Sequence, residues 1–199
     1  MPVTRVAIAL LVLMVAGCGE DAVREGKSPP ATSNPDPVVL WRAPRDPLER
    51  TVKAGLRPER KEFLVHHAHA HLDVFVDGKP IVVPAGIGIN IQDPEVRKFT
   101  DPVSYGGIER CRKPCISPLH THDATGILHT ESKSAKPNKL GQFLTEWGVR
   151  LPDGAAVYVN GKPYRQDPRA IALTDGKEIA IVIGTPPKHI PKTADLSNA

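Results

Sequence analysis

Apolar and polar residues alternate along residues 66–76, "HHAHAHLDVFV", with the period of two that is typical of a β-strand. The alternation puts His67, His69 and His71 on one face of the predicted strand. His66 falls on the opposite face, together with the apolar residues at even positions, or lies in the loop that leads into the strand. The strand therefore has one face suited to a core and one face crowded with imidazoles.

Three short dipeptides predict tight turns between strands. Asp77-Gly78 lies between two strand-like runs, and both positions of such a pair accept the positive φ that a two-residue hairpin needs. "VYVNGKP" around Asn160-Gly161 repeats the pattern of "VFVDGKP", which we interpret as two similar hairpins rather than a duplication. Asp175-Gly176 is expected to join a further strand pair.

Two segments have the apolar spacing of helices. Residues 138–148, "NKLGQFLTEWG", are predicted to form a helix capped by Asn138 and ended by Gly148. Its apolar stripe consists of Leu140, Phe143, Leu144 and Trp147. Residues 46–56, "DPLERTVKAGL", predict a short helix with Asp46 as N-cap, Leu48, Val52 and Leu56 on one face, and Gly55 at its end.

These elements predict an α+β fold of mainly antiparallel β-hairpins with one or two short helices, in a single domain at residues 46–191. Residues 192–199 are expected to be a tail. The 21 prolines and 16 glycines are consistent with many turns.

The N-terminus predicts export. Residues 1–17 combine Arg5 with an apolar run too short to span a bilayer comfortably, as in a signal peptide. "VAGC" resembles the lipobox of bacterial lipoproteins, which implies a lipid on Cys18; a plain secretory signal is the alternative. Residues 18–45, rich in proline and polar residues, are predicted to be a lipid-anchored linker. We therefore expect a membrane-anchored protein on the extracytoplasmic side.

Charge adds little to this description. The formal net charge of +4 is small and not clustered, so we expect no nucleic-acid partner. The sequence does not indicate which proteins the chain binds.

Seven of the 8 histidines lie in two stretches, residues 66–71 and residues 120–129. The second stretch, "LHTHDATGILHTES", predicts a hairpin with residues 123–126 as its loop. A four-residue loop pairs His122 with Ile127 and sets His120 opposite His129. A three-residue loop would turn His129 to the other face, so the grouping depends on the register.

Imidazoles and a carboxylate on adjoining strands predict a metal site for Zn²⁺ or Cu²⁺, and the same donors suit Fe²⁺ or Mn²⁺. A histidine-rich surface strand without metal is the alternative. The expected ligands are His69, His71, His120, His122, His129 and Glu131. They exceed a four-coordinate zinc shell, so some of them only support the others, the ion has a higher coordination number, or two ions bind. His67 and Asp123 are expected to support these ligands from outside the first coordination shell.

The sulfur-containing residues narrow the choice of metal. Both methionines, Met1 and Met14, fall in the predicted signal peptide, which disfavours thioether-bound Cu(I). Cys111 and Cys115, in "CRKPC", are predicted to form a disulfide in an oxidising compartment. The alternative is a thiol pair that binds copper or exchanges electrons.

"HAHLDVFVDGKPIVVPAGIGI", "CISPLHTHDATGILHTES" and "LGQFLTEWG" resemble phrases of an uncharacterised family of bacterial secreted proteins and lipoproteins, over about residues 46–190. The resemblance implies export and a shared histidine site, but no reaction. The main functional expectation is metal acquisition, buffering or resistance. A metal-dependent hydrolase or oxidoreductase, with three histidines and a glutamate at its centre, and an adhesion module with a structural metal are the alternatives.

Overall fold

The computed structural model of the chain describes residues 41–197 and residue 199. The predicted signal peptide, Cys18 and all of the linker up to residue 40 lie outside the described residues. No helix within residues 41–197 has the length and apolar character that crossing a membrane requires.

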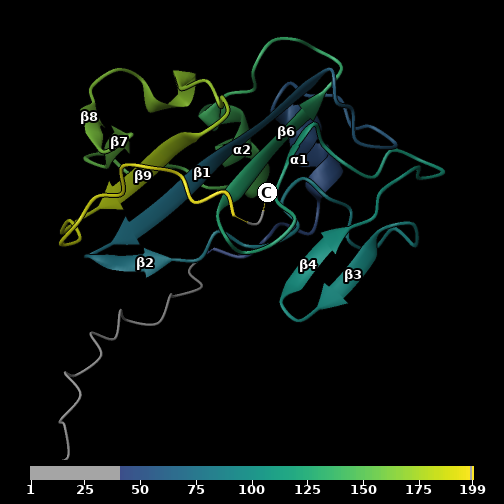
Figure 1. Ribbon diagram of the computed structural model, residues 1–199, viewed down its shortest axis with the longest axis horizontal. Coiled ribbons are helices and arrows are strands. Elements are labelled where there is room, and N and C mark those ends of the chain that lie inside the picture. Colours follow the sequence, from purple (N-terminus) through teal and green to yellow (C-terminus); the bar gives the residue numbers. More distant parts are fainter. Residues whose placement is uncertain (1–40, 198) are drawn as a thin grey trace, which may run out of the picture. The chain divides into compact units, whose positions relative to one another are not determined.

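A seven-stranded sheet forms the frame of the domain (Figure 1). Six strands follow the order β5-β6-β1-β9-β7-β8, and β2 pairs with the end of β1. The strands are β1 (His66–Val76), β2 (Lys79–Ile81), β5 (Leu119–His120), β6 (Ile127–Ser132), β7 (Ala156–Val159), β8 (Lys162–Tyr164) and β9 (Lys177–Ile183). A separate two-stranded hairpin consists of β3 (Arg97–Thr100) and β4 (Val103–Gly106).

The long strand β1 holds the sheet together because it pairs on both edges. Its first half pairs antiparallel with β6, from His66 opposite Ser132 to His71 opposite Ile127. Its second half pairs parallel with β9. Most pairs are antiparallel, as expected, but this central parallel pair makes the sheet mixed, which the expectation of hairpins did not include.

The helix α2 (Leu140–Trp147) confirms the helix predicted over residues 138–148. The four apolar residues of its stripe are at most 2% exposed. Gly148 ends the helix in the left-handed conformation, with φ of 78°. The N-cap is Lys139 rather than Asn138, whose side-chain amide instead donates to the carbonyl of Pro118.

The helix α1 (Pro47–Lys53) also forms where it was predicted, but its details differ. The Asp46 carboxylate makes no capping hydrogen bond, because it accepts one from the Arg50 guanidinium at 2.7 Å. Leu56 packs against the core, but Val52 is 63% exposed and Thr51 is fully buried, so the prediction for Val52 was wrong. A third, 3-10 helix, η1, spans Pro168–Ala170.

Two of the three predicted hairpin turns are confirmed. Asp77 and Asn160 both have φ of 49°, and each is followed by a glycine with positive φ. The strand pair expected around Asp175-Gly176 is wrong, since only β9 follows the turn and no strand precedes it. The Asp175 carboxylate accepts a hydrogen bond from the backbone N–H of His69, so this turn docks on β1 instead.

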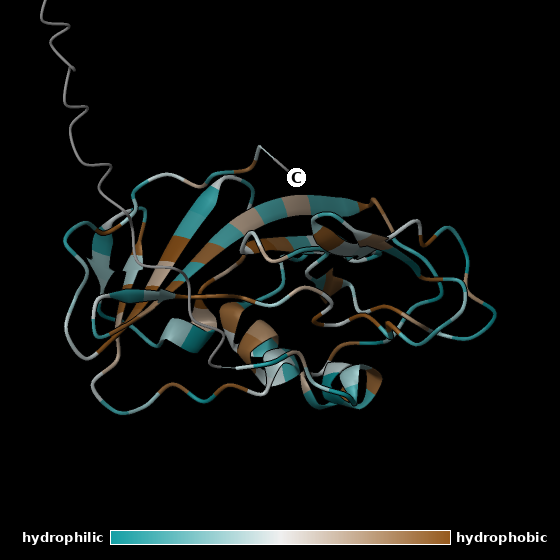
Figure 2. Cartoon of the chain, turned by 90° about the horizontal axis from the view of Figure 1, so that it is seen from below, coloured by the Kyte–Doolittle hydropathy of each residue, from teal (hydrophilic) through white to brown (hydrophobic). Residues whose placement is uncertain are grey.

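The sheet buries one face against α2, which lies on that side together with α1 (Figure 2). The even-numbered residues of β1 face this core, where Leu72 contacts the same buried cluster as Phe143 and Leu144. The odd-numbered residues of β1, including His67, His69 and His71, point to the opposite face. The core residues of β1 therefore lie on one face of the strand, and His67, His69 and His71 lie on the other.

Candidate metal centre

Three adjacent strands place histidines in a row across the sheet. His69 of β1 pairs with His129 of β6, which in turn pairs with His120 of β5. Directly paired residues point to the same face on strands about 4.8 Å apart. The predicted register of His120 opposite His129 is therefore confirmed, although β5 ends at His120 and the pair of His122 with Ile127 does not form.

The first candidate group contains His120, His122, His129 and Glu131. One ligand atom from each of these residues lies within 4.8 Å of the others. His120 and Glu131 are buried, so an ion held here would be largely shielded from water.

Backbone carbonyls orient two of these imidazoles. The Nδ1 atom of His120 donates to the carbonyl of Ser117 at 2.9 Å, and Nδ1 of His122 donates to the carbonyl of Tyr105. Because a carbonyl only accepts, both neutral rings carry their proton on Nδ1 and leave a lone pair on Nε2. This is the tautomer that a metal ion needs at Nε2.

The two free Nε2 atoms of His120 and His122 face each other at 3.2 Å. Two lone pairs at this distance repel unless a proton or a cation lies between them. Zn–N bonds of about 2.0–2.1 Å in a tetrahedral shell separate two nitrogen ligands by about 3.3 Å. The observed separation is thus close to that of two ligands on one ion.

Burial keeps most of these imidazoles neutral. It is the main cause that lowers the pKa of His129 and lowers the pKa of His120 well below its usual value, and neighbouring imidazoles add to the effect. Burial also lowers the pKa of His69. Metal ligands must be unprotonated, so these rings are ready to bind at neutral pH.

The Glu131 side chain lies between the histidines of β1 and those of β5. Its Oε1 atom is 3.4 Å from Nε2 of His67 and 3.6 Å from Nδ1 of His129. Burial alone would raise the pKa of Glu131, but the imidazoles of His129, His122 and His67 outweigh it and lower the pKa. The carboxylate is therefore ionised, and its buried Oε2 atom has no hydrogen-bond partner.

His71 lies apart from this group. Its Nδ1 atom is 2.9 Å from Oε2 of Glu178, and its Nε2 atom donates to the carbonyl of Thr125 at 2.9 Å. Burial would lower the pKa of His71, but the hydrogen bond to Glu178 and the nearby Asp73 carboxylate raise it. Both ring nitrogens are engaged, so His71 ties the 123–126 loop to the sheet, and with Asp73 and Glu178 it forms a separate group whose ligand atoms lie within 4.8 Å of one another.

Asp123 also has a different role from the expected one. Its Oδ1 atom accepts hydrogen bonds from the backbone and the hydroxyl of Thr125, which stabilises the loop. Within residues 41–197 it makes no hydrogen bond to an imidazole; the carbonyls of Ser117 and Tyr105 hold the ring nitrogens instead.

Glu62 faces the cluster although the sequence reasoning did not single it out. Its Oε1 atom is 3.9 Å from Nε2 of His122. Burial and the Glu131 carboxylate raise the pKa of Glu62. Glu62 precedes β1 in a segment without regular alternation, so no periodic pattern pointed to it.

Cys111 and Cys115 form the predicted disulfide, with an S–S distance of 2.04 Å. Both are fully buried in a second apolar cluster with Ile89, Ile108 and Ile116. The disulfide removes both thiols as metal ligands, so a copper-thiolate site does not fit this form of the protein.

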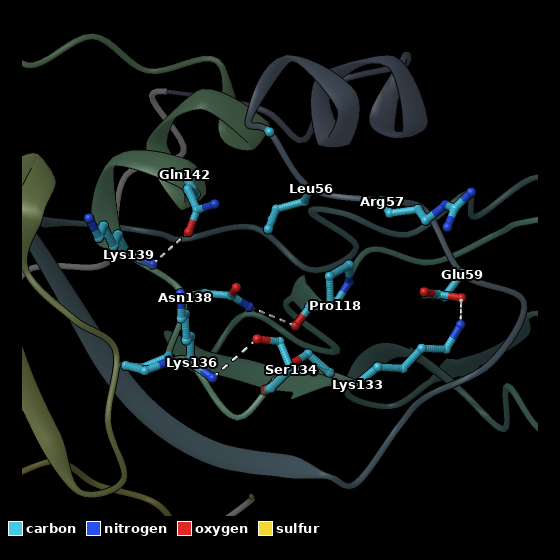
Figure 3. Close-up of a pocket in the computed structure, with 13 residues that line it drawn as sticks. Leu56, Arg57, Glu59, Pro118, Lys133, Ser134, Lys136, Asn138, Lys139 and Gln142 are labelled. Carbon is cyan, nitrogen blue, oxygen red and sulfur yellow. Dashed lines mark hydrogen bonds and ion pairs between the residues drawn. The ribbon is translucent and has the colours of Figure 1, made fainter.

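A hollow beside α2 is distinct from the histidine cluster (Figure 3). Four basic side chains line it, and Lys133 donates to the Glu59 carboxylate at 2.7 Å. The basic residues are Arg57, Lys133, Lys136 and Lys139. None of the predicted metal ligands lines this hollow, and its positive charge does not suit a metal cation.

In comparisons with protein-family models, curated proteins and solved structures, the chain matches none of them. The resemblance to an uncharacterised family of exported proteins therefore stays a prediction.

Proposed function

We propose that the chain binds a divalent transition-metal ion, Zn²⁺ or Cu²⁺, through His120, His122, His129 and Glu131. The observation that carries the proposal is the pair of Nε2 atoms of His120 and His122, 3.2 Å apart, with both Nδ1 atoms bonded to backbone carbonyls. Nitrogen ligands with one carboxylate suit both ions.

We further propose that the protein is lipid-anchored outside the cytoplasm and serves metal acquisition, buffering or resistance. The apolar run before "VAGC" and the proline-rich linker support the anchor. The disulfide supports an oxidising compartment.

A metal-dependent enzyme is the second candidate. The His67 side chain beside Glu131 is 42% exposed, so an ion in contact with it would stay accessible to water or substrate. An open coordination position favours catalysis, whereas a closed shell of four protein ligands favours storage or a structural ion.

Titration of Zn²⁺ and of Cu²⁺ into the metal-free chain tests the proposed site. We expect the His120→Ala/His122→Ala variant to bind at least about tenfold more weakly than the wild type, because two of four ligands are lost. His189→Ala is the matched control, since His189 is exposed and lies outside both histidine stretches. Equal affinity in the wild type and the double variant would show that this is not the site.

The same titration has an expected pH dependence. The pKa values of His120 and His129 are lowered by burial, so both rings stay unprotonated at pH 7. Affinity should therefore be constant near pH 7 and fall only below about 6.5, as protons begin to compete with the metal.

A further inference from the structure

Two imidazoles of β1 form a second group with the same glutamate. The ligand atoms of His67, His69 and Glu131 lie within 4.8 Å of one another. The Nε2 atoms of His67 and His69 are 3.1 Å apart, again close to the separation of two nitrogen ligands on one ion. Glu131 belongs to both groups.

One ion does not account for all of these ligands. Five imidazoles and one carboxylate exceed the four ligands of a tetrahedral zinc shell. The pair on β1 and the pair on and after β5 come from opposite sides of β6, whose flanking strands lie about 10 Å apart. Among the described residues, the ligand atoms of these two pairs do not fall into one group within 4.8 Å; each pair groups with Glu131 separately.

We propose that Glu131 bridges two metal ions, one held with His120, His122 and His129 and the other with His67 and His69. This inference rests on the proposed function, because it adds a second ion to the first site. A single carboxylate can contact two ions, and the ions of such two-metal sites lie about 3.5–4 Å apart.

The charges around Glu131 favour a pair of cations. Oε1 of Glu131 already faces imidazoles of both groups, and its buried Oε2 has no other partner among the described residues. The Glu62 carboxylate lies 3.9 Å from His122 and supplies a second negative charge. Two carboxylates lessen the repulsion between two divalent ions.

The two ions should differ in affinity. The second site has three protein ligands, of which His67 is 42% exposed, whereas the first site has four that are better buried. The second ion should therefore bind at least about tenfold more weakly and exchange with solvent.

The test is the number of Zn²⁺ ions bound per chain, from calorimetric titration and native mass spectrometry of the metal-free chain. We expect two for the wild type and one for His67→Ala/His69→Ala, with the affinity for the first ion unchanged within about threefold. His66→Ala, on the same strand but the opposite face, should still bind two.

A second measurement needs no variant. Two Cu²⁺ ions about 3.5–4 Å apart should show spin–spin coupling in the electron paramagnetic resonance spectrum of the saturated wild type. One ion per saturated wild-type chain, two ions in the His67→Ala/His69→Ala variant, or uncoupled copper would overturn the bridge. The absence of any bound metal would instead overturn the proposed function itself.

Discussion

At His120 and His122, backbone carbonyls decide which ring nitrogen is left for a ligand. The carbonyls of Ser117 and Tyr105 hold the two Nδ1 protons, and both Nε2 atoms turn toward the same point. His71, on the same strand face as His69, has both nitrogens occupied by Glu178 and Thr125. The hydrogen-bond partners of a histidine, more than the strand face on which it lies, therefore decide whether a ring nitrogen is left for a ligand.

Glu146 of α2 gives a prediction at this scale that is independent of metal. It is fully buried, and the hydroxyls of Thr51 and Ser117 nearby make no hydrogen bond of normal geometry with its carboxyl oxygens. Burial raises the pKa of Glu146 from 4.5 to about 8. Between pH 4.5 and about 8, the folded chain holds a proton on Glu146 that the unfolded chain has lost. The contribution of protonated Glu146 to the free energy of unfolding is therefore full below pH 4.5 and is lost as the pH rises through about 8.

Glu146→Gln, which mimics the protonated acid, should therefore be more stable than the wild type, by on the order of 3 kcal/mol near pH 7. The difference should shrink toward zero near pH 4.5. Urea unfolding of the metal-free chain at several pH values measures it. Glu109→Gln, at an exposed position, is the control and should show no such trend. A Gln variant no more stable than the wild type at pH 8 would show that Glu146 is not a buried acid.

At the scale of elements, the features predictable from the sequence are those fixed by neighbours along the chain. The apolar stripe of α2 and the glycine turns at Gly78 and Gly161 depend on local spacing, and all three form. The pair of His120 with His129 was also predictable, because an even-length loop fixes its register. The pairing of His69 with His129 joins distant parts of the chain, and that loop does not fix it.

Elements that depend on distant partners were not predictable in this way. The parallel pairing of β1 with β9 joins residues about a hundred positions apart, and nothing local distinguishes it from a hairpin. The turn at Asp175-Gly176 was predicted correctly, but the strand expected before it does not form. The Asp175 carboxylate instead accepts a hydrogen bond from the backbone N–H of His69. Glu62 was missed for the same reason, since only the tertiary fold brings it to His122.

At the scale of the whole molecule, the proposed location and the proposed site support each other. A metal-binding domain on a lipid anchor would meet its ion outside the cytoplasm, where a disulfide persists. We expect residues 1–17 to be absent from the mature chain and Cys18 to carry a diacyl or triacyl adduct. Intact-mass analysis of the membrane fraction measures this. An unmodified Cys18, or cleavage elsewhere, would contradict the anchor and leave the metal site untouched.

Elemental analysis of the protein purified from the membrane fraction of the cells that produce it tests most directly whether the histidine site holds a metal. We expect at least one zinc or copper ion per wild-type chain, and a large loss of that metal in His120→Ala/His122→Ala protein purified in parallel. The His189→Ala protein should retain the wild-type content, because His189 lies outside both histidine stretches. Wild-type protein with no more transition metal than the double variant would show that His120 and His122 do not hold a metal in the cell.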